Sequence, residues 1–252
     1  IGSSTGRAGA LTEIKMSVQS IYLEGACIDG ETYAGLSGHS CHHDLIDAII
    51  MNSTAIIEPV LDRNDQPTGA EKTTGNVTEV GLINYLVNCG VDAKAKIVER
   101  EQTAAERKAF QIEFSSDRKK ATIAFWTDNS RSTVRVFCKG APDYVLKSVT
   151  QMVGADGEVT EMDDSMKQHT LDKIVCDFAK RSLRTLLIAY KDVDADTWNS
   201  IIGDTHGRKL SRDEQSALYD QIESDLTMVG ICGLKDPLRP GIRDAVDVCK
   251  RA

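Results

Sequence analysis

A predicted strand runs directly into a predicted helix at Phe137-Cys138-Lys139-Gly140-Ala141-Pro142-Asp143. Residues 134–138 alternate apolar and polar side chains, which is typical of a strand, and Pro142 is well tolerated in the first turn of a helix. Gly140 would let a ligand approach the backbone, Lys139 brings a positive charge, and the new helix begins with free N–H groups. The junction therefore indicates either an anion-binding loop or an ordinary turn.

The segments on either side predict an α+β fold. The period-two alternation of residues 110–114, 122–126 and 134–138 predicts three consecutive strands, with a turn at Asp128-Asn129. Consecutive strands beside pairs of helices favour an antiparallel β-sheet flanked by helices. The further strands that we expect are 15–23, 184–193 and 226–234. The expected helices are 44–55 behind the cap Asp44, one from the cap Thr78 to Gly90, one from Pro142, 166–178 and 212–222.

Two polar stretches lack a clear period. Residues 62–76 contain Asp-Arg-Asn-Asp-Gln-Pro-Thr-Gly, and we expect a surface loop with little structure of its own. Residues 156–164 contain five acids and no base, which predicts a solvated turn. Residues 94–108 are read only as a charged stretch.

The charge balance excludes some classes of function. Thirty Lys and Arg stand against 38 Asp and Glu, so the net charge is −8 over 252 residues. Proteins that bind nucleic acid or an anionic membrane need a positive electrostatic field, so this net charge argues against both functions. A local basic pocket is still compatible with it. No stretch approaches the roughly 20 apolar residues of a membrane span, and residues 1–10 lack the apolar core of a signal peptide. We expect the chain itself to be soluble, monomeric and without a nucleic-acid partner.

The cysteines and histidines are compatible either with a metal site or with core thiols and a polar loop. The seven cysteines are scattered and contain no Cys-x-x-Cys pair, which favours reduced cytosolic thiols that mostly fill the core. His39, Cys41, His42 and His43 are metal-ligand types within five residues, but adjacent side chains diverge. We favour a polar loop before a helix and expect no metal site.

Two common nucleotide motifs, Gly-x-x-x-x-Gly-Lys-Ser/Thr and Gly-x-Gly-x-x-Gly, are absent from the sequence. Three other segments accompany the 137–143 junction: Gly75-Asn76-Val77-Thr78-Glu79, Phe114-Ser115-Ser116-Asp117-Arg118-Lys119 and Leu183-Arg184-Thr185-Leu186. In this order the four segments resemble the nucleotide-binding domain of P-type ATPases, in particular the calcium-pump branch. Any one of them alone would be a weak signal.

The resemblance extends to both ends of the chain. Leu11-Thr12-Glu13-Ile14-Lys15-Met16 looks like the tail of the family's phosphorylation motif, and residues 233–240 resemble its return hinge. Ser116 stands where reticulum-type calcium pumps carry an arginine, so the chain looks closer to the plasma-membrane type. Gly6 aligns with the phosphorylated aspartate, and a glycine cannot form an acyl phosphate. We therefore expect no catalytic residue in this chain.

The resemblance implies roles for particular residues. Phe114 would stack on adenine, although it could also be the last core residue of its strand. Glu79, beside Thr78, would accept from the exocyclic amine of adenine and could also stabilise the helix dipole. Lys139 would line the pocket floor, and Arg184 would reach the phosphates. Lys119 is a weaker candidate that could belong to a solvated edge. The expected nucleotide-binding residues are Thr78, Glu79, Phe114, Lys119, Lys139, Gly140, Arg184 and Leu186.

The resemblance also implies a division of the chain. Residues 1–10 are interpreted as an added linker, and 11–23 as the segment after the phosphorylation motif. Residues 24–232 form the nucleotide-binding domain, and 233–252 form the return hinge, with Asp236, Pro237 and Arg239.

The implied function is that of a cytosolic ATP-binding domain in a calcium-transporting P-type ATPase. It would hold the adenosine of MgATP for phosphoryl transfer to an aspartate on a neighbouring domain, and would bind ATP or ADP without turnover by itself. The phosphorylation and actuator domains of the pump would be its partners, at the cytosolic face of a membrane. The alternatives are a regulatory or interaction module that has lost the nucleotide, and the same domain of a pump for another cation.

Overall fold

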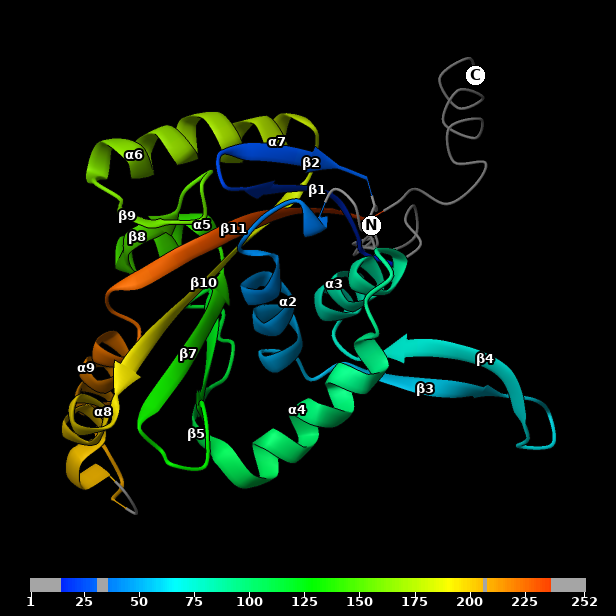
Figure 1. Cartoon of the computed structure of the whole chain (residues 1–252), viewed down its shortest axis with the longest axis horizontal. Helices are drawn as coiled ribbons and strands as arrows, with labels where there is room; N and C mark the ends of the chain where they lie inside the picture. Colours follow the sequence, from blue (N-terminus) through cyan, green and yellow to red (C-terminus); the bar gives the residue numbers. More distant parts are fainter. Residues whose placement is uncertain (1–14, 31–35, 206–207, 237–252) are drawn as a thin grey trace, which may run out of the picture.

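The computed structural model describes residues 15–30, 36–205 and 208–236, which form a twisted β-sheet with helices on both faces (Figure 1). The sheet has nine strands, seven of them in the order β2-β1-β11-β10-β7-β6-β5, while β8 pairs with β11 and β9 with β8. Within the described residues the strand pairs are antiparallel except for β8 and β11, which run parallel. The predicted α+β class with an antiparallel sheet is confirmed.

The elements have the following bounds. The strands of the main sheet are β1 Ser17–Leu23, β2 Ala26–Asp29, β5 Lys108–Ile112, β6 Lys120–Trp126, β7 Thr133–Gly140, β8 Val149–Val153, β9 Val159–Glu161, β10 Arg184–Asp194 and β11 Leu226–Lys235. A separate hairpin consists of β3 Ile56–Leu61 and β4 Pro67–Thr74. Within the described residues, the α-helices are α2 His42–Met51, α3 Val77–Asn88, α4 Ala93–Arg107, α5 Pro142–Val145, α6 Asp164–His169, α7 Cys176–Lys180, α8 Ala195–Ile202 and α9 Arg212–Ile222, and a π-helical segment, Thr170–Val175, joins α6 to α7.

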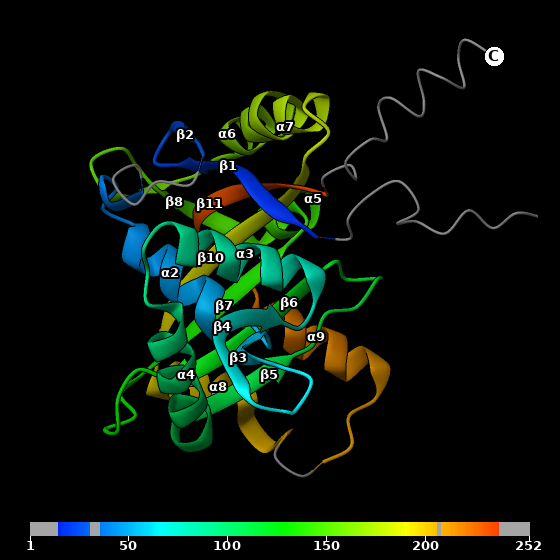
Figure 2. The same ribbon diagram turned by 90° about the vertical axis from the view of Figure 1, so that its right-hand side faces the viewer.

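The two faces of the sheet carry different helices. Figure 2 shows α2, α3 and α4 in front of the strands, whereas α6 to α9 lie beyond them or along the borders of the sheet. Successive side chains of a strand point to opposite faces of the sheet, so neighbouring residues of β10 pack into different cores. Ile188 joins the core under α2 and α3, while Leu187 and Ala189 pack with Phe178 of α7 on the other face. Both faces of the central strands are thereby buried.

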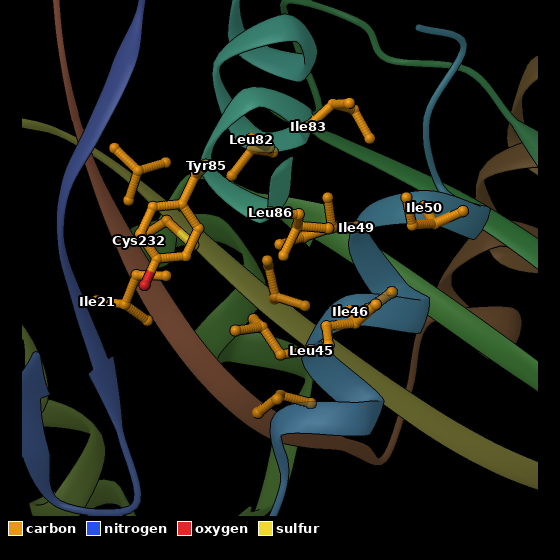
Figure 3. Close-up of a cluster of buried hydrophobic side chains, with 14 of the residues drawn as sticks. Ile21, Leu45, Ile46, Ile49, Ile50, Leu82, Ile83, Tyr85, Leu86 and Cys232 are labelled. Carbon is orange, nitrogen blue, oxygen red and sulfur yellow. The ribbon is translucent and has the colours of Figure 1, made fainter. Parts of the chain in front are cut away.

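The largest core lies between α2, α3 and the sheet (Figure 3). Leu45 and Ile49 of α2 recur at i and i+4, and Leu82 and Leu86 of α3 do the same, so each helix presents an apolar stripe. These side chains meet Ile21 of β1 and Cys232 of β11. The core fixes the C-terminus of α2 and the N-terminus of α3 against one corner of the sheet.

The prediction of a surface loop over residues 62–76 was wrong for 67–74, which form a strand, whereas 62–66 are an exposed turn. Ile56–Leu61 and Pro67–Thr74 pair as a hairpin that projects away from the main sheet in Figure 1. Most of β4 is exposed, so it lacks the buried face that produces alternation in a sequence. The turn is held by the Asp62 carboxylate, which accepts from the N–H groups of Asn64 and Gln66. Backbone pairing, rather than burial, makes this segment a strand.

Helix α4 was not expected, and several other elements begin or end at residues that differ from those expected. The charged stretch after Lys94 is the 15-residue helix α4. Helix α2 begins at His42 and ends at Met51, so Asp44 is in its first turn instead of capping it. The cap of α3 is Asn76, whose side chain accepts from the N–H of Thr78. The strand expected through Phe114 stops at Ile112.

Some expectations concern residues that the structure does not describe. The linker and Gly6, as well as Pro237 and Arg239, lie outside the described residues. Among the residues that are described, none of the helices has the length and apolar character needed to cross a bilayer.

Candidate functional site

A cavity of about 530 Å³ opens where the C-terminus of α2 and the N-terminus of α3 meet strands β5, β6, β7 and β10. Six of the eight nucleotide-binding residues expected from the sequence line it, although they come from four separate segments. Thr78 and Glu79 begin α3, Phe114 follows β5, Lys139 and Gly140 end β7, and Leu186 lies on β10. The remaining lining residues are Asn52, Ser53, Thr54, Asn76, Gln111, Ile112, Glu113, Ala121, Thr122 and Ile123.

An ion pair forms the polar floor of this cavity. Nζ of Lys139 lies 2.6 Å from Oε1 of Glu79 and also donates to the backbone carbonyl of Asn52. The side chains are 11% and 14% exposed respectively, so water screens the pair only weakly. The two charges are therefore largely neutralised by each other.

The pKa values of both partners lie below their usual values. Burial is the largest influence on the pKa of Lys139 and lowers it, although Glu79 opposes this effect. Burial would raise the pKa of Glu79, but the charge of Lys139 and the hydrogen bonds from Lys139 and Thr54 together outweigh it and lower the pKa. Glu79 is consequently a carboxylate near neutral pH.

Phe114 forms an apolar wall of the cavity and is 62% exposed. It lies beyond the end of β5, and the core on that side contains Ile112 and partly buried Phe110 instead. An aromatic ring in this position leaves a π-surface open to a ligand, since burial elsewhere does not occupy it. The structure thus places Phe114 outside the core.

Gly140 allows a close approach between β7 and the turn before β6. A Cβ atom at this position would lie 2.5 Å from the carbonyl oxygen of Lys119 and 2.7 Å from Cβ of Lys120. The same carbonyl accepts from the N–H of Ala141, which joins the turn to the start of α5. A glycine is therefore required here by packing, in addition to any contact with a ligand.

Lys119 and Arg184 do not line the cavity. Lys119 is exposed and directly precedes β6, and its positive φ of 54° interrupts the extended backbone of that strand. Arg184 is exposed at the start of β10, two residues before Leu186. Residues two apart in a strand share a face, so Arg184 is on the cavity side of β10, beyond Leu186.

Two groups that position the site were not singled out in the sequence. Glu223, at the end of α9, is fully buried and pairs with Arg118 and with Lys120, whose Nζ is 2.7 Å away. It also accepts from the Thr122 hydroxyl at 2.6 Å. These contacts anchor the turn between Phe114 and β6. The acid lies about a hundred positions away from its partners, so no local pattern could have indicated it.

The second overlooked group is Asn52-Ser53-Thr54, directly after α2. The Asn52 amide donates to the carbonyls of Ala121 and Phe137, which fixes the end of α2 to β6 and β7. Ser53 and Thr54 then meet Glu79 across the cavity. The sequence signal that could have indicated these residues is a run of three small polar residues directly after an apolar helix.

The histidine-rich loop is organised around a carboxylate. The Glu24 side chain lies 3.0 Å from Nδ1 of His39 and accepts from the Ser40 hydroxyl and from the N–H of Cys41. Burial raises the pKa of the Cys41 thiol to about 12, which keeps this sulfur protonated near neutral pH. In residues 15–30, 36–205 and 208–236, no three His, Cys, Asp or Glu side chains come together as a metal site would require.

Comparison with known proteins identifies the family of the chain. The sequence profile of the family described as "P-type ATPase, cytoplasmic domain N" matches residues 41–241. The chain belongs to this family. The resemblance recognised from the four motifs is confirmed, and the cavity lies within the matched region of the N domain.

Individual relatives are calcium pumps. The N domain is 28% identical over 266 residues to the plasma membrane calcium-transporting ATPase mca-1 of Caenorhabditis elegans, with 98% of this chain and 20% of the relative covered. It is 27% identical over 247 residues to calcium-transporting ATPase 10, plasma membrane-type, of Arabidopsis thaliana, covering 98% of this chain and 21% of the relative. It is 30% identical over 214 residues to calcium-transporting ATPase 2 of Cryptococcus neoformans, covering 82% and 14%. The chain thus spans about a fifth or less of these relatives.

The hinge expected at Asp236 is adjacent to the first described residue. Ser17 pairs with Lys235 across β1 and β11, and the N–H of Lys15 donates to Oδ1 of Asp236 at 3.3 Å. Arg184 pairs with Leu234 in the same sheet, so the cavity strand β10 is directly bonded to the strand that leads to Asp236.

Proposed function

We propose that this N domain binds ATP in the cavity between α2, α3 and the sheet, and holds it for phosphoryl transfer to an aspartate of a neighbouring domain. The observation that carries the proposal is the exposed aromatic ring of Phe114, which lines a cavity in which the charges of Glu79 and Lys139 already neutralise each other. A flat, largely neutral base suits such a place better than an anion does, since the Lys139 charge is already engaged by Glu79.

The size and lining of the cavity support a nucleoside. Its volume of about 530 Å³ lies in the usual range for small-molecule sites. Apolar side chains from three strands, Ile112, Ile123 and Leu186, face polar groups at the N-terminus of α3. Adenine would stack on Phe114, with its polar edge toward Glu79 and Thr54.

We propose that the phosphates extend out of the cavity toward Arg184 and Lys119. Both are exposed cations, Lys119 beside the lining residue Gly140 and Arg184 two positions before Leu186, and a guanidinium donates two hydrogen bonds to a phosphate. Since the described residues bring together no metal-ligating cluster, no step of this proposal uses a metal ion held by the domain, and magnesium would accompany the phosphates. The work of the domain is positioning, which can supply a large part of the rate of a transfer reaction.

The remaining proposals concern the whole protein. We propose that it is a calcium-transporting ATPase of the plasma-membrane type, whose N domain faces the cytosol and works with phosphorylation and actuator domains. The division into 1–10, 11–23, 24–232 and 233–252 remains part of this proposal. Because Gly6 aligns with the phospho-acceptor, the chain by itself would bind ATP without turnover.

Titration of the chain with ATP and ADP, followed by calorimetry and NMR, tests the proposal. We expect weak binding of both nucleotides, little dependence on magnesium, and chemical-shift changes around Phe114 and Glu79 but not around the distant strands β8 and β9. A flat titration at millimolar ATP would instead support the regulatory module without nucleotide. Incubation with γ-labelled ATP should leave no acid-stable label on the chain.

A further inference from the structure

At two places in the sequence, a pair of basic residues precedes a serine or threonine with one residue between them. These tetrapeptides are Lys119-Lys120-Ala121-Thr122 and Arg208-Lys209-Leu210-Ser211. A large class of serine/threonine kinases selects its substrates with acidic side chains that bind basic residues two and three positions before the acceptor hydroxyl. The sequence therefore offers two acceptors, and their surroundings in the fold distinguish them.

Thr122 is inaccessible in the folded chain. It is 2% exposed and pairs with Ile112 of β5 and with Cys138 of β7, so both neighbouring strands cover it. Its hydroxyl also donates to the buried carboxylate of Glu223 at 2.6 Å. A kinase could reach this hydroxyl only after the sheet had opened.

Ser211 has the opposite environment. Residues 208–211 belong to no helix or strand, and Arg208, Lys209 and Ser211 are all exposed. Ser211 is the N-cap of α9, and its φ of −65° and ψ of 165° make its backbone extended. Exposed irregular segments open locally at low cost, so this one can enter the cleft of an enzyme while the rest of the domain stays folded.

The contacts that hold Ser211 are local and exposed. Its hydroxyl accepts from the N–H of Glu214 at 3.2 Å, and the Glu214 carboxylate accepts from the N–H of Ser211 at 2.9 Å and from Arg208. The side chains of Arg208 and Glu214 are 57% and 45% exposed, so water competes for this ion pair. These contacts can be exchanged without disturbing a hydrophobic core.

We propose that Ser211 is a phosphorylation site for a serine kinase that recognises Arg208 and Lys209. In the reaction, Oγ of Ser211 bonds to the γ-phosphorus of ATP, and the bond from that phosphorus to the oxygen bridging the β-phosphate breaks. The hydroxyl proton passes to the aspartate base of the kinase, and ADP leaves. The inference goes beyond the proposed function and does not depend on nucleotide binding by this chain.

The folded chain also has groups that suit the product. Phosphoserine carries a charge of about −2, and at position 211 it would lie at the start of an 11-residue helix, whose N–H groups and dipole favour an anion. Arg208 and Arg212 flank this position and can donate to the phosphate, Arg208 by leaving Glu214. The phosphate would thereby replace the present cap, and α9 should stay folded.

The test incubates the folded chain with ATP and the catalytic subunit of cAMP-dependent protein kinase, which has this specificity, and locates the phosphate by mass spectrometry. We expect phosphate on Ser211 and none on Thr122. Ser211→Asn keeps a strong N-cap without a hydroxyl and should abolish the modification. Arg208→Gln keeps the acceptor but removes a recognised charge, and should slow the modification about tenfold. Ser216→Asn is the matched control, since this exposed serine of α9 has two acids at the corresponding positions, and it should change nothing.

Three results would overturn the proposal. The first is modification that persists in Ser211→Asn, and the second is modification that is equally fast in Arg208→Gln. The third is a folded chain that takes up no phosphate, whether or not a synthetic peptide of residues 204–216 does. A modified peptide would mean that the fold hides the serine, and an unmodified one that the basic pair is not recognised. Failure of the chain to bind ATP in the titration described above would refute the proposed function and leave this inference unaffected.

Discussion

Replacing Phe114 with alanine should weaken nucleotide binding, while costing much less stability than truncation of a buried phenylalanine. The ring is 62% exposed, so little more than a third of it contributes to folding through burial. Truncation of a fully buried phenylalanine costs about 3–5 kcal/mol, and scaling by the buried fraction gives about 1–2 kcal/mol here. Loss of an aromatic stacking surface costs about 1–3 kcal/mol per base, which corresponds to roughly a ten- to hundredfold weaker ATP complex.

Calorimetric titration with ATP and a denaturant unfolding curve on the same preparation measure the two effects separately. Phe125→Ala provides the opposite control, because Phe125 is only 3% exposed and packs in the core under α2 and α4. This variant should lose about 3–5 kcal/mol of stability, while its folded molecules should bind ATP with the original affinity.

The reasoning would be refuted by the reverse pattern. A Phe114→Ala chain that unfolds as easily as Phe125→Ala, or that binds ATP with undiminished affinity, would show that the ring supports the fold and is not a surface for the base.

Three further perturbations follow from the cavity floor and its edge. Lys139→Met should lower the free energy of unfolding by about 3 kcal/mol, because it leaves the buried Glu79 carboxylate without its cation. In a double-mutant cycle, adding Glu79→Gln to this variant should recover part of the lost stability. Since the pKa of Glu79 is lower in the folded chain, its contribution to stability is present above the ordinary glutamate pKa and is lost as the pH falls through the folded value. Urea unfolding between pH 7 and pH 3 should show a smaller acid loss for Glu79→Gln. Gly140→Ala should cost about 1–3 kcal/mol, measured as a lower thermal midpoint, because its Cβ would meet the backbone of Lys119; an unchanged midpoint would contradict the close approach.

The sequence predicts the elements that carry an apolar face or run better than those that carry none. Residues 212–222 form the expected helix, and β10 and β11 lie where apolar runs indicated strands. Hairpin strand β4 was missed because its stability comes from pairing with β3 and not from a buried face. Helix α4 was missed because charged residues dominate it, and even one of its buried positions is Arg100, which donates to the carbonyls of Ser53 and Ala55.

The cavity could be predicted in part because its motif residues lie at strand and helix ends that meet at one corner of the sheet. Six expected residues line it, although their roles in binding stay predictions. The pairing of Glu79 with Lys139 could not be read from the sequence, since it joins residues 60 positions apart. The contribution of Thr54 depends on where α2 stops, and a terminus is the least certain feature of a helix predicted from periodicity.

The β3–β4 hairpin is a place where residues can be inserted or deleted while the structure of the cavity stays the same. Its two strands leave and rejoin the domain at neighbouring points, since a Cβ at Gly75 would lie 2.9 Å from Cα of Ala55. Everything beyond that base is a two-stranded arm whose turn at Asp62–Gln66 is exposed. Lengthening a loop costs only about 0.6 kcal/mol for each doubling, and exposed tips tolerate insertion best. A reporter domain inserted after Asn64 would be connected through the two strands of the arm to residues 52–54 and 76–79, which border the site, and could report whether the site is occupied.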